Sequence, residues 1–145
     1  MSGKNVIFAG PANVCPVQTE AKVKSGETIK PGAVVVKSSG ELANHAVAGG
    51  GGAVYVANMN TLEQLSVDDN LTVGDTAQAF VLEAGQSYNV LVAATEVVTV
   101  DLALASAGDG TVTAATTSGA TPDVVLFYAE EALTVGASAQ LVRCR

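Results

Sequence analysis

The stretch Val73–Val92, VGDTAQAFVLEAGQSYNVLV, decides the fold class of this chain. Two apolar runs with strand character, Ala77–Leu82 and Tyr88–Val92, flank the turn-forming residues Glu-Ala-Gly-Gln-Ser. Gly-Asp opens the first run and an Asn precedes the last apolar residues. Such turn-forming residues at the ends of apolar runs are typical of a β-hairpin. The stretch therefore predicts a central hairpin in an all-β protein.

Similar runs recur on both sides of this stretch. The further strands that we expect are Pro16–Lys24, Ala33–Val36, Ala53–Val56, Glu96–Leu104, Thr111–Thr116, Asp123–Ala129, Ala132–Gly136 and Ala139–Arg145. Pro31-Gly32 suits the centre of a type II turn, and Gly108–Thr111 a tight turn. Asn58–Asp69 is the one place where a helical turn is expected, with Thr61 as its N-cap. We predict an all-β fold, a small β-barrel or sandwich built from hairpins, with at most one short helix.

The chain of 145 residues fits one domain with a sizeable core. We divide it into an extended, flexible N-terminal arm, residues 1–12, and a single β-rich domain, residues 13–145. In the arm, Val6-Ile7-Phe8 is followed by Ala-Gly-Pro, which stops regular structure. Such a triplet suits a peptide that adds itself as a strand to another protein's sheet. The alternatives are the first strand of the domain's own sheet and a frayed terminus.

Charges are few and unevenly placed. Only 14% of the residues are charged, against about 25% in an ordinary soluble domain. An extended partner surface, most commonly a symmetric oligomer, would explain this scarcity. Five lysines fall in the first 37 residues, namely Lys4, Lys22, Lys24, Lys30 and Lys37, whereas Ser38–Val142 contains twelve acids and no Lys or Arg. An acidic body argues against nucleic-acid binding. The lysines are either solvated strand edges or a basic face that meets an acidic partner.

The sequence predicts neither membrane insertion nor secretion. No apolar run approaches the roughly 18 residues of a membrane helix, and the N-terminal apolar run is too short for a signal peptide. Cys15 and Cys144 have no CxxC spacing and no His nearby, so a zinc site is not expected. Two ordinary thiols are the first expectation, and a bridge joining the two ends is the alternative.

No group of residues predicts an active site. His45 is the only histidine, and we expect it to be structural or solvent-facing. The adjacent acids Asp68-Asp69 and Glu130-Glu131 would point to opposite faces of a strand, so neither makes an acid/base couple. Asp109-Gly110 is better explained by turn chemistry than by calcium binding. We therefore expect no catalytic residue, no metal and no cofactor. A β-barrel enzyme with a site shared between subunits would need His45, Asp68 or Asp75 to meet across an interface.

Two segments of the chain have a similar layout. Ile29–Leu42 and Thr99–Val112 each contain a strand, a Gly-containing turn and a Gly-x-apolar restart. Identities at this offset are few, such as Ala33 with Ala103, so the pattern only suggests an internal duplication.

The order of these motifs resembles that of a known family. The chain has an "IKPG" strand start, then "GD…E-x-G" leading into an apolar "NVLVA", then "GDGT", an "A-x-E-A" strand and an arginine-flanked last strand. Over about Pro16 to Arg145 this order resembles the head decoration, or capsid cement, proteins of tailed bacteriophages. Each motif is short; the shared order carries the resemblance, while Cys15 and Cys144 are not motif residues and Glu130-Glu131 is the loosest match.

The resemblance implies a structural virion protein, not an enzyme, on the outer surface of an HK97-type capsid. It would bind the major capsid protein and bridge capsomers as a homotrimer or, less favoured, a dimer. The capsid-contact residues that we expect are Lys4, Val6, Ile7, Phe8, Lys22 and Lys24. The alternative is a virion or cell-surface β-sandwich that recognises carbohydrate or a host surface. Such sites usually present aromatic platforms, and this chain has no Trp and three Tyr.

Overall fold

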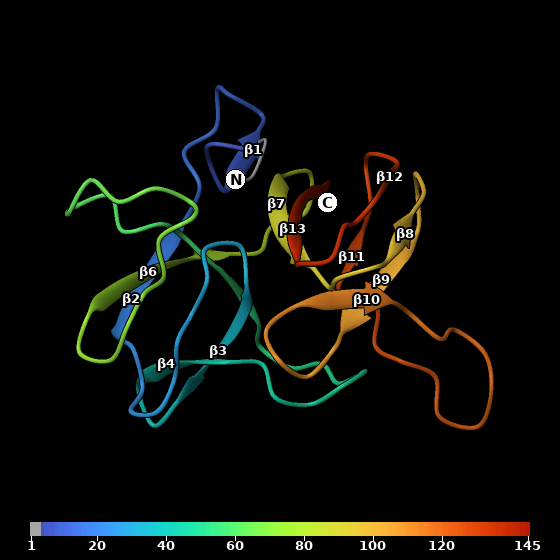
Figure 1. Cartoon of the computed structure of the whole chain (residues 1–145), viewed down its shortest axis with the longest axis horizontal. Helices are drawn as coiled ribbons and strands as arrows, with labels where there is room; N and C mark the ends of the chain where they lie inside the picture. The colour runs from blue at the N-terminus through green and yellow to red at the C-terminus, as the bar shows by residue number, and fades with distance from the viewer. Residues whose placement is uncertain (1–3) are drawn as a thin grey trace.

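The computed structural model describes residues 4–145, and it confirms the all-β prediction (Figure 1). Within the described residues there are thirteen strands and no helix. The strands are β1 (Phe8–Gly10), β2 (Gln18–Lys22), β3 (Val34–Ser38), β4 (Glu41–Asn44), β5 (Tyr55–Ala57), β6 (Thr76–Val81), β7 (Ser87–Val92), β8 (Val97–Val98), β9 (Ala103–Ser106), β10 (Val112–Ala114), β11 (Phe127–Tyr128), β12 (Leu133–Thr134) and β13 (Gln140–Cys144).

The helical turn expected in Asn58–Asp69 is wrong. The segment is a series of turns in which Asn60 Oδ1 accepts a hydrogen bond from the Glu63 N–H, at 3.2 Å. Gln64 then adopts a φ of 57°, in the left-handed region. A single left-handed residue ends a right-handed helix, so the Asn60 cap starts a turn that cannot continue.

The strands β2 to β6 form the first barrel. Their order is β2-β6-β5-β3-β4, with every neighbouring pair antiparallel. A parallel bridge between Val23 and Leu42 brings the first and last strands together, and the Lys24 N–H donates to the Leu42 carbonyl at 2.9 Å. The interior is lined by small and medium apolar side chains because few strands enclose a narrow space. These residues are Val23, Ile29, Ala33, Val35, Leu42, Ala57, Leu71, Ala77 and Ala79.

The strands β7, β9, β10, β11 and β13 form the second barrel. β7 pairs with β13, β9 pairs with both β10 and β11, and each of these pairs is antiparallel. The bridge between Ala129 and Cys144 joins β11 to β13, and the parallel pair Val92–Val112 joins β7 to β10. β8 and β12 form a two-stranded ribbon beside this barrel.

The two barrels have the same topology and equivalent strand pairing. The equivalent strands are β2 with β7, β3 with β9, β4 with β10, β5 with β11 and β6 with β13. The bridge Val23–Leu42 corresponds to Val92–Val112, and both are parallel. The equivalent antiparallel pairs are Ala21–Ala77 with Val90–Val142, Lys37–Leu42 with Ser106–Val112, Val35–Tyr55 with Leu104–Phe127, Ala57–Ala79 with Ala129–Cys144 and Ile29–Leu71 with Val98–Leu133.

Irregular backbone features repeat as well. Gly32 donates its N–H to the Ala57 carbonyl, and the equivalent Asp101 donates to the Ala129 carbonyl, both at 2.8 Å. Both residues have a positive φ, 86° at Gly32 and 65° at Asp101. Since hydrogen bonds, pairing and turn conformations all repeat, the chain is an internal structural duplication. The similarity between Ile29–Leu42 and Thr99–Val112 reflects this repeat, but its register is one residue out in the first strand. Val35 is equivalent to Leu104, so Ala33 corresponds to Leu102 and not to Ala103.

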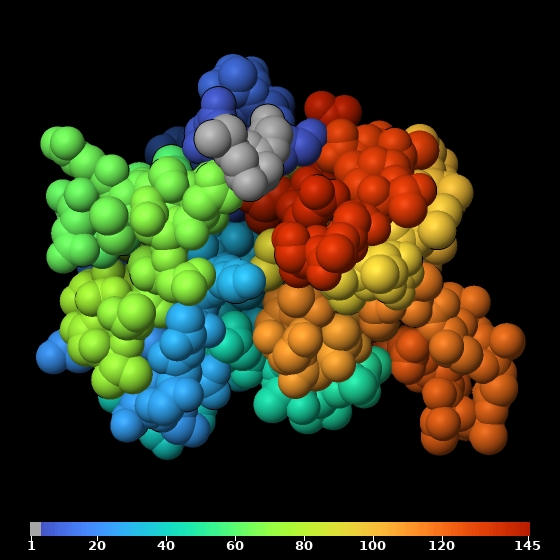
Figure 2. Space-filling model, viewed as in Figure 1, coloured from blue at the N-terminus to red at the C-terminus, as the bar shows by residue number. Residues whose placement is uncertain are grey.

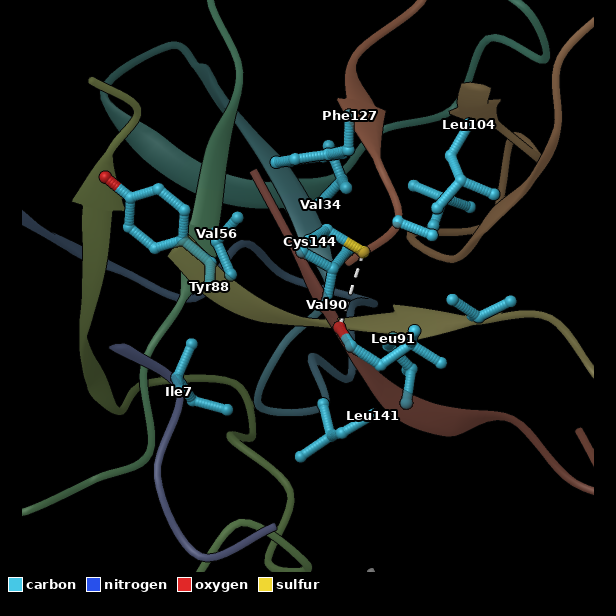
Figure 3. Close-up of a cluster of buried hydrophobic side chains, with 14 of the residues drawn as sticks. Ile7, Val34, Val56, Tyr88, Val90, Leu91, Leu104, Phe127, Leu141 and Cys144 are labelled. Carbon is cyan, nitrogen blue, oxygen red and sulfur yellow. Dashed lines mark hydrogen bonds between the residues drawn. The ribbon is translucent and has the colours of Figure 1, made fainter. Parts of the chain in front are cut away.

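Alternate residues of the first barrel's strands serve two different cores. Val35 and Ala57 point into the first barrel, whereas their neighbours Val34 and Val56 join the large cluster that fills and covers the second barrel. Figure 3 shows Val34 and Val56 beside Phe127 and other side chains of the second barrel. The period of two in a strand allows one sheet to line its own interior and also to pack on its neighbour.

The stretch Val73–Val92 contains the two predicted strands, but the predicted hairpin is wrong. β6 pairs with β2 and β5, and β7 pairs with β1, β10 and β13, so these consecutive strands belong to different barrels. The corner between them is held by Tyr88, whose hydroxyl accepts from the Glu83 N–H at 3.3 Å and lies 3.1 Å from the Val81 carbonyl oxygen. Burial is the main cause that raises the pKa of Tyr88. Hairpins do form at β3–β4 and β9–β10.

The segment expected to be a flexible arm forms part of the domain as far as the structure describes it. β1 pairs with β7, and the Ile7 carbonyl accepts the Asn89 N–H at 2.7 Å. Asn89 Nδ2 also donates to the Val6 carbonyl at 2.7 Å, and the Ile7 side chain is only 1% exposed. This segment lies at the top of Figure 1, against β7. Strand pairing with β7 and burial of apolar surface stabilise the docked segment. Together they exceed the conformational entropy that the segment loses when it is ordered. Residues 1–3 of the expected arm lie outside the described residues.

Candidate contact surface

The apolar triplet Val6-Ile7-Phe8 divides into three different environments. Ile7 is buried against the domain and is not accessible to a partner in this conformation, so its expected role as a capsid contact stays a prediction. The Phe8 ring lies 5.9 Å from the rings of both Phe80 and Tyr88, so it closes a cluster that spans the two barrels. Val6 is 49% exposed and is the member of the triplet that a partner can reach.

Lys4 is held close to the end of the chain. Its Nζ lies 2.9 Å from a carboxylate oxygen of Glu131. Although burial works to raise the pKa of Glu131, that pKa is lowered, because the Arg143 N–H and the Lys4 ammonium stabilise the carboxylate. This ion pair fastens the N-terminal segment to the second barrel. Lys4 is therefore engaged within the domain and is not displayed alone.

Lys22 and Lys24 lie on β2 and just beyond its end, at the side of the first barrel where β2 meets β4. Lys22 is exposed, and Lys24 Nζ donates to Ser38 Oγ at 3.2 Å. Lys37 reaches the same strand, since its Nζ donates to Thr19 Oγ1 and lies 5.8 Å from the centre of the Tyr55 ring. Three amines thus gather along one strand. Sequence reasoning named Lys22 and Lys24 but missed Lys37, which only the curvature of the barrel brings to β2.

His45 is a structural residue between the barrels. It is 3% exposed, its Nδ1 lies 2.7 Å from Ser106 Oγ, and its Nε2 lies 3.2 Å from the Gly51 carbonyl oxygen. The backbone oxygen of His45 accepts the Gly110 N–H at 3.3 Å. These contacts tie the first barrel to the loop between β9 and β10. The Ser106 hydroxyl and the imidazole lie at hydrogen-bond distance, but both are buried, and Ser106 Oγ also accepts the Gly108 N–H, so their contact is used within the domain.

The acidic pairs are also used for structure. Glu130 pairs with Arg143 at 3.3 Å, and its neighbour Glu131 binds Lys4 instead. Asp69 accepts hydrogen bonds from the backbone N–H and the hydroxyl of Ser66, and these bonds lower the pKa of Asp69. Asp109 likewise accepts from Thr111, which lowers the pKa of Asp109. Within residues 4–145 no three His, Cys, Asp or Glu side chains cluster as a metal site would require.

Both cysteines are free thiols, so the bridge that would join the chain ends is not formed. Cys15 is exposed and Cys144 is buried. Burial, assisted by the nearby Glu131 and Glu130, raises the pKa of Cys144 to about 12. A thiol with this pKa is protonated near neutral pH and is a poor nucleophile. Cys144 is therefore a core residue, seen in Figure 3 below Val34.

Two shallow hollows lie along the seam between the barrels. They have volumes of about 200 and 300 Å³ and share Lys30, Leu91 and Ala139 in their walls. The seam is closed at its centre by the Pro31-Gly32 turn, since the Leu91 N–H donates to the Gly32 carbonyl at 2.8 Å. Among the described residues, the ionisable side chains in their walls are Lys30, Asp68 and Asp109.

Two parts of the surface project from the body. Residues 116–122 are all exposed and form the loop at the lower right of Figure 2, and Asp123 closes its neck by accepting the Thr116 N–H at 2.8 Å. Leu62, 75% exposed, stands on the turns between β5 and β6. The part of the chain that the structure describes has no helix suited to crossing a membrane.

No family model matches this chain, and no curated protein gives a significant match.

Proposed function

We propose that this protein is a structural, non-catalytic virion component. It binds the outer surface of an HK97-type phage capsid through the major capsid protein, and it stabilises the shell by bridging capsomers. Many copies on a symmetric lattice need only weak individual contacts to stabilise the shell collectively. In this proposal the protein acts as a small homo-oligomer, for which a trimer is favoured over a dimer.

This proposal rests on the positions, in the structure, of the motifs that the chain shares with the head decoration proteins. The "IKPG" turn at Lys30–Gly32 packs against β7 of the second barrel, and the "GDGT" turn at Gly108–Thr111 contacts the first barrel. The "E-x-G" segment forms the corner held by Tyr88. These short motifs therefore lie at the contacts between the two barrels. The motif order that resembles the decoration proteins is thus tied to how the two barrels are joined.

The distribution of side chains supports the same proposal. The ionisable candidates of an active site are engaged in structural contacts, as His45 and Glu131 are. Of the large apolar side chains in the exposed class, Tyr128 is the one aromatic among the described residues. Carbohydrate sites usually present several aromatic faces, so this surface favours a protein partner over a glycan.

Co-sedimentation with empty heads tests the proposal. Purified protein is mixed with HK97-type heads that lack their own decoration protein, and pelleted protein is measured against the major capsid protein. We expect saturation at a fixed ratio, and weaker binding for Lys22→Glu than for the matched control Lys30→Glu. Absence of binding at any concentration, with a folded protein, would overturn the proposal, and binding to a glycan array would favour the carbohydrate alternative.

A further inference from the structure

Within residues 4–145, one strand edge of the second barrel is covered by β1, whereas the equivalent edge of the first barrel, along Gln18–Lys22, has no strand paired to it. In the second barrel, the N–H groups of Asn89, Leu91 and Ala93 point to the same side of β7 and donate to Ile7, Gly32 and Val112. The equivalent residues in the first barrel are Glu20 and Lys22 of β2 and Lys24, just beyond its end. Of these, Lys24 donates to Leu42, as Ala93 does to Val112.

The direction of the backbone groups of β2 follows from the hydrogen bonds at its ends. The Val17 carbonyl accepts from Val81 and the Val23 N–H donates to Asp75, so the odd-numbered residues point toward β6. Because successive residues alternate, the N–H groups of Glu20 and Lys22 point away from β6, to the same side as the Lys24 N–H that meets β4. Gln18, Glu20 and Lys22 are all exposed.

We propose that this bare edge of β2 binds an extended, acidic strand of a partner protein by β-augmentation. The site is formed by the outward backbone groups of Gln18–Lys22. The inference rests on the proposed function in one respect, since it takes the partner strand to come from the capsid shell. The chemistry itself, main-chain pairing plus carboxylates, follows from the edge and its surroundings.

The acidic character of the strand follows from the amines that surround the edge. Lys22 is exposed on β2, Lys24 reaches Ser38, and Lys37 reaches Thr19. The carboxylate of Glu20, which would oppose an acidic partner, is turned to the outer face of β6, where Gln78 Nε2 donates to it at 2.9 Å. Main-chain hydrogen bonds would give affinity, and side chains that alternate toward these lysines would give selectivity.

The second barrel shows how such a strand is held. β1 lies antiparallel along the start of β7, with the Ile7 carbonyl on the Asn89 N–H. The environment of the incoming side chain differs between the two sites. Ile7 enters an apolar core, whereas the edge of β2 is flanked by Lys37 and Thr19, so the first barrel is suited to a polar occupant and not to a second copy of β1.

Binding of defined peptides to the full chain tests the proposal without any capsid. The probe is a fluorescent peptide Thr-Glu-Val-Glu-Val-Thr, and its anisotropy is measured with the full chain at low and high salt. The comparison peptides are Thr-Lys-Val-Lys-Val-Thr and Thr-Glu-Pro-Glu-Pro-Thr, which change the charge and remove strand pairing respectively. We expect binding of the acidic strand alone, weakened by salt and reduced about five- to tenfold by Lys22→Glu.

Glu20→Pro is the decisive variant. The Glu20 N–H points outward, so proline there removes a docking hydrogen bond without touching the ladder to β6. We expect lost peptide binding with an unchanged melting temperature, whereas the control Ala21→Pro lowers the melting temperature because the Ala21 N–H faces β6.

Binding that survives Glu20→Pro, or equal binding of all three peptides, would overturn the proposal. Dimerisation of the free protein that Glu20→Pro abolishes would also overturn it, in favour of a second copy. Head binding that persists in Glu20→Pro would leave the proposed function intact and remove only this site.

Discussion

Replacing Gly32 by alanine tests the joint between the two barrels. Gly32 has a φ of +86°, and a Cβ added there would lie 2.2 Å from Leu141 Cδ2 and 3.0 Å from the Asn89 carbonyl oxygen. The leucine side chain can move, but the carbonyl belongs to β7 and is fixed by pairing. The substitution therefore combines left-handed strain with a backbone clash across the seam.

Gly40 provides a matched control for the conformational part. Its φ is +83°, and an added Cβ would meet no heavy atom within 4 Å. Gly40→Ala should therefore cost only the left-handed strain, about 1–2 kcal/mol. Gly32→Ala adds overpacking of about 1–3 kcal/mol, so its total is about 2–5 kcal/mol.

Thermal and urea denaturation measure both variants. At this chain length each kcal/mol lowers the melting temperature by about 2–4 °C. We expect Gly32→Ala to melt clearly below Gly40→Ala, with the difference reporting the contact between barrels. Equal melting temperatures for the two variants would refute the claim that the Gly32 turn is packed against β7.

Three further predictions concern the N-terminal segment and the end of the chain. Ile7→Ala should lower the free energy of unfolding by about 2–5 kcal/mol in urea titrations, because Ile7 is buried, while Val6→Ala should change it by less than about 0.5 kcal/mol; equal effects would mean that β1 is not docked in solution. A thiol reagent at pH 8 should modify one cysteine of the native protein, Cys15, and two after unfolding, since Cys144 is buried with a pKa of about 12; rapid modification of both native thiols would contradict this burial. The pKa of Glu131 is lowered on folding from its ordinary value of 4.5, so its contribution to stability is present above that pH and is lost as the pH falls through the folded pKa; Glu131→Gln should flatten the stability profile below about pH 4.5, and an unchanged profile would show that the contact with Lys4 does not form.

The duplication explains why so few residues are shared between the halves. At equivalent positions the side chains need only point in the same direction and have a compatible size. Ala57 and Ala129 are one such pair, and Val35 and Leu104 are another. At Gly32 and Asp101 the shared requirement is a positive φ, which Gly adopts freely and Asp tolerates. A repeat of this kind leaves a matching pattern of burial and turns, with only scattered identities in the sequence.

The candidate contact residues show a similar division between prediction and structure. Lys22 and Lys24 could be named from the sequence because their charge contrasts with the acidic remainder of the chain. The burial of Ile7 could not, because the apolar triplet suits a foreign sheet and its own sheet equally well. The bare edge of β2 also escaped prediction, since an edge is defined by the absence of a neighbouring strand.

The sequence by itself determined the all-β class and the approximate positions of most strands and turns. It missed β4, which lies in no predicted strand, and it joined β8 and the start of β9 into one expected strand, Glu96–Leu104. Alternating apolar residues and β-branched runs favour strands, and Gly, Pro and Asp favour turns, through interactions within a few residues. Only the tertiary structure decided which strands pair. The Glu-Ala-Gly-Gln-Ser segment between β6 and β7 reads locally as a hairpin turn, yet the apolar faces of Phe80 and Tyr88 are best buried when the chain passes from one barrel to the next. Strand pairing depends on the apolar surface that residues far apart in the chain bury together. The local sequence pattern does not contain this information.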